Sequence, residues 1–310
     1  MNSPPPPPAA PHQPAQRSAG LLAGLVAYVL WGVLPLYFAL LPGVSAVELV
    51  ANRVVWSVAF LALLLAIYRL FPALLDTLRR PRIVAALLLS ATLIAGNWLL
   101  YVWAVATNHV VAASLGYFLN PLANVLMGTL LLKESLRSGQ RIAIVIAAIG
   151  VALLAMGEIQ TLWISLTLAT TFAVYGLVRK FTPVPSAVGL MIETLLLTVP
   201  SLLALGWIAQ HGGLTIGRDT PSTLLLIGLG AVTSVPLLLF AVAARALPLV
   251  TLGLMQYIAP TLQFLSGVFI LGEHLSPERW GSFLLIWAAL ALFVWDSLRG
   301  ARARALAAPP

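Results

Sequence analysis

Two charged side chains lie inside long apolar stretches of the sequence. Arg53 lies in the second stretch, and Glu193 lies in the seventh, at the position that an internal repeat pairs with Asn52. An arginine at such a depth in a membrane costs at least ~2.5 kcal/mol on insertion scales, so it needs a partner or a wet cavity. We expect Arg53, Asn52 and Glu193 to flank a central cavity, where Arg53 and Glu193 bind each other or the charged ends of a zwitterionic solute. A static ion pair that locks two helices is the alternative interpretation.

Amide and aromatic side chains recur at helical spacing in the same stretches. Residues three or four apart share one face of a helix, and polar groups in a bilayer need partners. We therefore predict that these faces line the cavity, with hydrogen bonding between helices as the alternative. The predicted lining residues are Tyr28, Trp31 and Pro35, then Asn97 and Tyr101, then Tyr117, Asn120 and Asn124, and finally Gln256, Tyr257, Pro260 and Gln263.

Two prolines lie at equivalent positions of the repeat. Pro121 and Pro260 remove backbone hydrogen bonds and should kink their helices. We predict that they act as a gating element, with a role in packing alone as the alternative. Glu134 and Glu273 end the matching helices, and we interpret both as solvated charges at helix ends.

The composition places these residues in a membrane protein. Of the 310 residues, 61% are hydrophobic and 8% are charged, whereas soluble domains carry about 25% charged residues. The net charge is +8, but the cations lie in short gaps between apolar runs. A nucleic-acid-binding protein would gather them in a patch, so we expect a lipid bilayer as the partner and no nucleic acid.

Ten stretches are long enough to cross a bilayer, which takes about 20 apolar residues as a helix. We expect an all-α membrane protein of ten transmembrane helices. Lys and Arg divide 14 to 2 between alternate gaps, with Arg53 left inside a span, so both termini should be cytoplasmic. The stretches are 19–41, 45–69, 82–105, 110–132, 140–157, 160–178, 186–209, 221–243, 247–270 and 279–297.

A repeat divides the chain into two halves. Pro121, Gly128, Leu132 and Glu134 recur 139 positions later as Pro260, Gly267, Leu271 and Glu273. Because each half holds five helices, the second copy is inserted upside down, as in many alternating-access carriers. We predict a disordered Pro-rich tail at 1–17, a first five-helix repeat at 18–157, a second, inverted repeat at 158–298 and a basic cytoplasmic tail at 299–310.

Five strings resemble the RarD family of EamA-type transporters, within the drug/metabolite transporter superfamily. The resemblance implies two inverted five-helix repeats in a bacterial inner membrane and solute transport, as export or uptake, without ATP hydrolysis. One departure is Asn52, where the family usually has a histidine before the arginine, so proton transfer by that histidine is not available here. The strings are Gly96-Asn97-Trp98-Leu99-Leu100, the ten residues from Ala113 to Leu122, the six from Tyr175 to Lys180, Glu193-Thr194, and the seven from Gln256 to Leu262.

Other functions find little support in the sequence. It has no G-x-x-x-x-G-K-[ST] phosphate loop, no H-E-x-x-H and no G-x-S-x-G, and it has no cysteine for disulfides or thiolate metal sites. We therefore predict a secondary carrier that exports a small organic solute. We expect it not to be an enzyme and to need no metal or cofactor. A passive channel and an intramembrane enzyme are the alternatives. Gly20 and Gly24 permit close helix approach, and we expect that contact to lie inside the bundle. The sequence does not decide between a monomer and a homodimer.

Overall fold

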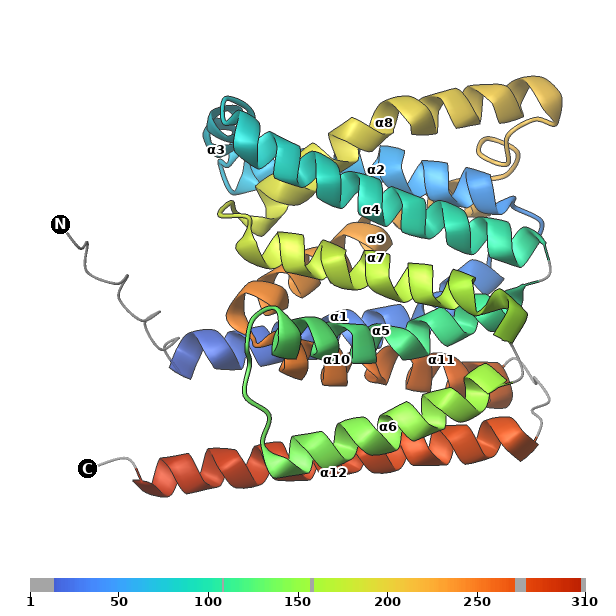
Figure 1. Cartoon of the computed structure of the whole chain (residues 1–310). Coiled ribbons are helices and arrows are strands. Elements are labelled where there is room, and N and C mark those ends of the chain that lie inside the picture. The colour runs from blue at the N-terminus through green and yellow to red at the C-terminus, as the bar shows by residue number, and fades with distance from the viewer. Residues whose placement is uncertain (1–13, 108, 157–158, 271–276, 308–310) are drawn as a thin grey trace.

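The computed structural model describes residues 14–107, 109–156, 159–270 and 277–307, and no strand occurs in this part of the chain (Figure 1). Long helices run roughly antiparallel across one bundle. The helices are α1 (Pro14–Ala39), α2 (Ala46–Ile67), α3 (Phe71–Leu78), α4 (Pro81–Ala106), α5 (Val110–Leu130), α6 (Ser138–Met156), α7 (Leu162–Phe181), α8 (Ser186–His211), α9 (Thr220–Ala246), α10 (Leu249–Gln256), α11 (Ile258–Phe269) and α12 (Pro277–Ala307), with a 3-10 turn at Ile159–Thr161.

Each of the ten predicted stretches holds a helix. The ninth is divided at Tyr257 into α10 and α11, because Pro260 has no N–H to donate to the carbonyl of Gln256. Pro121, in contrast, lies inside the continuous helix α5. The short helix α3 was not predicted, since its eight residues fall below the length that spans a bilayer.

The predicted tails are partly helical. α1 begins at Pro14, so the last four residues of the predicted N-terminal tail belong to a helix. A proline is compatible with a first helical turn because the N–H that it lacks would have no partner there. α12 continues to Ala307 and includes the basic residues from Arg299 onward. Residues 1–13 and Glu273 lie outside the described residues.

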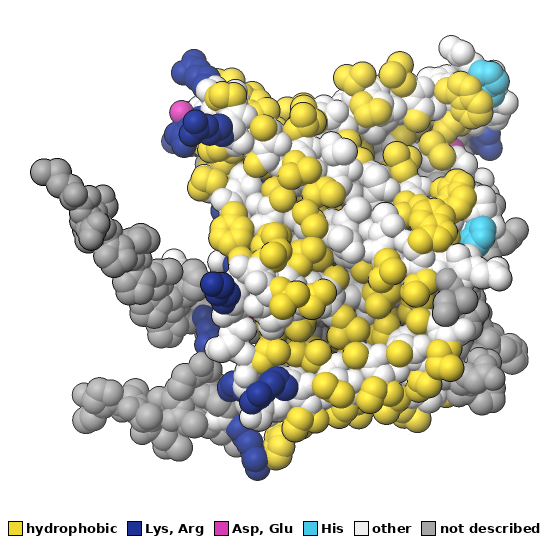
Figure 2. Space-filling view, in the orientation of Figure 1, with side chains coloured by type: hydrophobic (Ala, Val, Ile, Leu, Met, Phe, Trp, Pro, Cys, Tyr) yellow, Lys and Arg dark blue, Asp and Glu magenta, His cyan; other side chains and the backbone are white. Residues whose placement is uncertain are grey.

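The outer surface of the bundle is apolar. Six helices of the described residues are long and apolar enough to cross a membrane, namely α1, α2, α4, α7, α8 and α9, and α6 and α12 contain shorter apolar segments. Large apolar side chains cover the visible face (Figure 2), and Leu22, Leu203 and Trp207 are 63%, 70% and 62% exposed. A surface of this kind is stable against lipid rather than water, so the chain is a multi-pass membrane protein.

The two halves of the chain interleave instead of forming separate domains. α1 packs against α9 and α11, α2 against α8 and α9, α4 against α7 and α8, and α5 against α7 and α10. α6 lies along α12 at one side of the bundle (Figure 1). Every one of these contacts joins a helix before residue 158 to one after it.

Glycines allow several of these helices to touch. A Cβ at Gly230 of α9 would lie 2.3 Å from the carbonyl oxygen of Trp56 in α2, a distance at which only glycine fits. A Cβ at Gly20 would lie 2.6 Å from the Cβ of Ala246, and one at Gly24 would lie 3.4 Å from that of Ala243. The prediction that Gly20 and Gly24 make an internal contact is therefore confirmed.

Most described cations lie at one end of the bundle, called the basic end below (Figure 2). α1 begins and α12 ends there, and the α2–α4, α5–α6, α7–α8 and α9–α10 connections lie there as well (Figure 1). Among residues with described side chains, Arg218 is the one Lys or Arg at the opposite end of the bundle. The basic end carries Arg17, Arg69, Arg79, Arg80, Arg82, Lys133, Arg137, Arg141, Arg179, Lys180, Arg245 and Arg299.

Candidate functional site

A cavity of about 320 Å³ lies between helices of both halves. It extends from Tyr28 in the middle of α1 to Phe38 and Ala46, which flank the α1–α2 connection. The cavity therefore reaches the end of the bundle opposite the basic end. Its polar and aromatic lining residues are Tyr28, Trp31, Phe38, Arg53, Asn97, Trp98, Tyr101, Tyr117, Asn120, Phe172, Gln256 and Gln263.

Arg53 enters the cavity from the second turn of α2. Its Nε donates to Thr233 Oγ1 of α9 at 3.0 Å, and its guanidinium carbon lies 4.6 Å from the centroid of the Trp98 ring, a favourable cation–π distance. Among the described residues, no carboxylate oxygen lies within 4.0 Å of its nitrogen atoms. Arg53 thus brings an uncompensated positive charge to the cavity wall.

Polar side chains of α4 and α5 complete this wall. The rings of Tyr101 and Tyr117 meet edge to face, with centroids 5.6 Å apart, and both residues line the same cavity as Arg53. Asn97 Nδ2 donates to the Leu168 carbonyl and to Thr171 Oγ1, both at 2.8 Å. Asn120 is buried and its Oδ1 has no partner among the described residues.

Gln263 shows how prolines and amides are matched in this fold. Pro35 in α1 cannot donate to the Trp31 carbonyl. Gln263 Nε2 from α11 donates to that carbonyl instead, at 3.0 Å. The amide therefore satisfies a backbone group that would otherwise be costly in a membrane.

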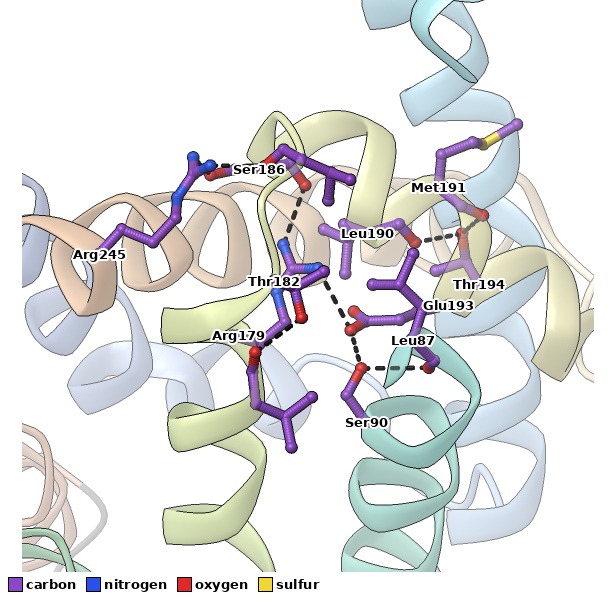
Figure 3. Close-up of polar contacts among 12 residues, drawn as sticks. Leu87, Ser90, Arg179, Thr182, Ser186, Leu190, Met191, Glu193, Thr194 and Arg245 are labelled. Carbon is purple, nitrogen blue, oxygen red and sulfur yellow. Dashed lines mark hydrogen bonds and ion pairs between the residues drawn. The ribbon is translucent and has the colours of Figure 1, made fainter. Parts of the chain in front are cut away.

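Glu193 lies outside this cavity and pairs with Arg179, not with Arg53 (Figure 3). Arg179 Nη1 of α7 lies 3.3 Å from Glu193 Oε1 of α8, and Ser90 of α4 donates to the same oxygen. Arg179 Nη2 also donates to the Ser186 carbonyl at 3.1 Å. Glu193 Oε2 has no described partner. A second cavity of about 10 Å³, lined by both Glu193 and Arg53, approaches the space of one water molecule.

Four other predicted residues do not line the larger cavity. Asn52 is bound within α2, where it donates to the Glu48 carbonyl at 2.9 Å and accepts from Trp56 Nε1 at 3.2 Å. The remaining three are Asn124, Tyr257 and Pro121. Asn124 joins α5 to α10 through a 2.7 Å bond to Gln256 Oε1, Tyr257 is fully buried, and the Pro121 carbonyl packs against Gly253.

The basic end is closed by charged side chains that bind helix termini. Glu134 accepts from the N–H groups of Leu249 and Val250 at 2.8 and 2.9 Å. Lys180 Nζ donates to the carbonyls of Ala244 and Leu247 at 3.1 and 2.6 Å. The interpretation of Glu134 as a solvated charge is wrong, because its carboxylate caps α10 from the other half of the chain.

Sequence reasoning missed Arg179 and Trp98 as partners of the two central charges. Arg179 was counted among loop cations because Lys180 follows it at the end of an apolar stretch. It is in fact buried, with 3% of its surface exposed. Trp98 directly follows Asn97, a predicted lining residue, and this proximity was the signal that could have identified it. The spacing of apolar residues, however, does not distinguish a ring that faces a cation from one that faces lipid.

The described residues contain no group of three or more His, Cys, Asp or Glu that could hold a metal ion. The cavity instead offers one guanidinium, three phenols, amides and aromatic faces. Such a set can bind a small organic molecule by charge, hydrogen bonds and stacking.

Comparisons with known proteins agree on one family. Residues 18–156 match the EamA-like transporter family. The chain is 43% identical to Protein RarD of Streptomyces exfoliatus over 95% of both chains, and 45% identical to an uncharacterized transporter of Pseudomonas aeruginosa over 93% of this chain and 97% of that one. It is also 43% identical to Protein RarD of Escherichia coli over 91% and 96%.

A solved crystal structure has the same fold. It superposes with a TM-score of 0.69 at 20% identity and covers 91% of this chain and 99% of its own. The shared fold extends over both halves of the chain, and the RarD relatives align with both halves as well. The apolar helices and the bacterial relatives identify a multi-pass inner-membrane protein that belongs to the RarD family of EamA-type transporters.

Proposed function

We propose that this protein is a secondary carrier that moves a small organic solute by alternating access, without ATP. The observation that carries the proposal is the 320 Å³ cavity, which reaches one end of the bundle and carries the unpaired charge of Arg53. Polar and charged groups at such depth mark substrate pathways in membrane proteins. The closed basic end supports a conformation in which the cavity is accessible from one side.

We propose that ten helices cross the membrane as two inverted repeats of five. The repeat pairs α1 with α7, α2 with α8, α4 with α9, α5 with α10–α11, and α6 with α12. The packing of helices supports this pairing. The α1–α9 contact has its counterpart in α4–α7, the α5–α7 contact in α1–α11, and the α2–α9 contact in α4–α8.

We propose that the basic end faces the cytoplasm, as the positive-inside rule requires. The cavity then faces the periplasm, and export is the direction that we assign to net transport. Single cysteines at Ser45 and Ser138 test the orientation, since the chain has no native cysteine. We expect an impermeant maleimide to label them from opposite sides, and labelling from one side would contradict the topology.

We propose that Pro121 and Pro260 shape a gate between the halves. A Cβ at Gly253 of α10 would lie 2.7 Å from the Pro121 carbonyl oxygen, so the Pro121 region of α5 packs against the helix that directly precedes the Pro260-containing helix α11. We expect Pro121→Ala and Pro260→Ala to slow turnover more than they weaken solute binding. Unchanged turnover in both variants would leave the prolines a packing role alone.

Flux in proteoliposomes tests the transport function. A panel of labelled small organic solutes is offered to reconstituted protein without ATP, with and without a pH gradient. A carrier gives saturable flux with counterflow of at least one solute, which Arg53→Ala reduces. An ohmic current that does not saturate would identify a channel, and formation of a new product would identify an enzyme.

A further inference from the structure

The cavity has one charged side chain among the lining residues that the structure describes. That side chain is Arg53. Two carboxylates could be expected to pair with Arg53, namely Glu48 in the same helix and Glu193, but both bind other groups. Glu48 accepts from the N–H and the hydroxyl of Thr215 at 2.6 and 3.0 Å, and Glu193 pairs with Arg179. The cavity wall therefore carries one positive charge that no described carboxylate neutralises.

The donors around this charge have the arrangement that a carboxylate needs. Arg53 uses its Nε to bind Thr233, so its two terminal nitrogens Nη1 and Nη2 are available to a ligand. These two nitrogens form the parallel donor pair that binds both oxygens of a carboxylate. Tyr101 and Tyr117 line the same cavity as Arg53, and their hydroxyls form no hydrogen bond with a described residue. They can donate to the same anion.

The rest of the cavity is suited to a flat apolar body. The rings of Trp31 and Phe172 line it and meet edge to face with centroids 6.0 Å apart, and Trp98 presents its ring beside Arg53. Aromatic walls of this kind favour stacked or edge-to-face contact with another ring. Asn120 and Gln256 add amide side chains to the lining of the same cavity.

We propose that the site binds organic monoanions that combine one carboxylate with an aromatic or flat apolar body. This inference rests on the proposed transport function and specifies its substrate class. The carboxylate binds Arg53, Tyr101 and Tyr117, and the ring lies among Trp31, Trp98 and Phe172. One guanidinium balances one negative charge, so a dianion would leave a net charge in a site of low dielectric. A simple cation would meet Arg53 with no carboxylate to offset it.

Three probes of one shape test the charge that the site selects. They are 3-phenylpropionate, the neutral 3-phenylpropionamide and 3-phenylpropylammonium. Binding to purified full-length protein in nanodiscs is followed by isothermal titration calorimetry, with flux in proteoliposomes as a separate readout. We expect the acid to bind and the other two probes to bind at least tenfold more weakly.

Variants of Arg53 test whether this side chain is the anion site. Arg53→Gln should weaken 3-phenylpropionate roughly ten- to hundredfold, the change expected from losing charge-assisted hydrogen bonds, and should leave the amide nearly unchanged. Arg53→Lys keeps the charge but loses the paired donors, so an intermediate loss is expected. Arg82→Gln is the matched control, because it removes the same charge from an exposed position outside the cavity.

The outcomes separate this inference from the function beneath it. Equal binding of the acid and the amide, no binding of the acid, or an Arg53→Gln variant that binds the acid as the parent does, would overturn the monoanion site. If a neutral or cationic solute nevertheless shows saturable counterflow, the protein is still a carrier, although not one selective for monoanions. Should Arg53→Gln fail to fold, the comparison of the three probes on the parent protein still decides.

Discussion

Glu134 connects the halves of the chain at the basic end, and its removal should loosen that end. α10 begins after Pro248, whose side chain cannot cap the helix. Glu134 supplies the cap from the first half, with bonds of 2.8 and 2.9 Å to the N–H groups of Leu249 and Val250. If the cavity opens to this side during transport, these bonds must break, so they stabilise the conformation described above.

The size of the effect follows from the bonds that are lost. A hydrogen bond to a charged group contributes about 1.5–3 kcal/mol, and the partial exposure of Glu134 places each bond at the low end. Glu134→Gln keeps one acceptor oxygen and loses one bond and the charge, a cost of about 1.5 kcal/mol. At 1.4 kcal/mol per factor of ten, the open form should become about tenfold more populated. Glu134→Ala loses both bonds and should shift it roughly a hundredfold.

Cysteine labelling measures this shift. Val125 of α5 is 4% exposed and packs in the same buried cluster as Val250, so Val125→Cys reports separation of α5 from α10. We expect a charged maleimide to label this cysteine about tenfold faster in Glu134→Gln. Asp219→Asn is the control. Asp219 also caps a helix, since it accepts from the N–H of Ser222 in α9 at 2.7 Å, but this exposed bond lies within one half of the chain. Equal labelling rates in the parent and the Glu134→Gln variant would refute the reasoning.

Two further predictions concern stability. Arg179→Gln leaves the Glu193 carboxylate buried without its cation, which typically costs 3–5 kcal/mol, so its melting temperature should fall clearly below that of the double variant Arg179→Gln/Glu193→Gln; the reverse order would contradict a direct pairing. Gly230→Ala places a methyl group 2.3 Å from the Trp56 carbonyl and should cost about 1–3 kcal/mol by overpacking. Its control is Gly206→Ala, where no atom lies within 4 Å and helix propensity should add about 0.5–1 kcal/mol; equal thermal shifts in both would contradict the close approach of α2 and α9.

The sequence by itself determined the membrane class and the positions of most helices, and it predicted the repeat that we propose. These follow from properties of neighbouring residues, since apolar length specifies a helix in lipid and the spacing of Pro121 and Pro260 is visible in the chain. The helical faces of Asn97, Tyr101 and Gln256 could also be read from their spacing, and all three border the cavity.

The tertiary structure alone decided which groups meet. Glu193 pairs with Arg179, and Glu134 caps a helix 115 residues away. Buried charges in a bilayer must find partners, but the partner depends on how each helix is rotated and which helices are adjacent. Those are properties of the whole packing, so spacing along one helix could not show that Arg53 would be left unpaired in the cavity.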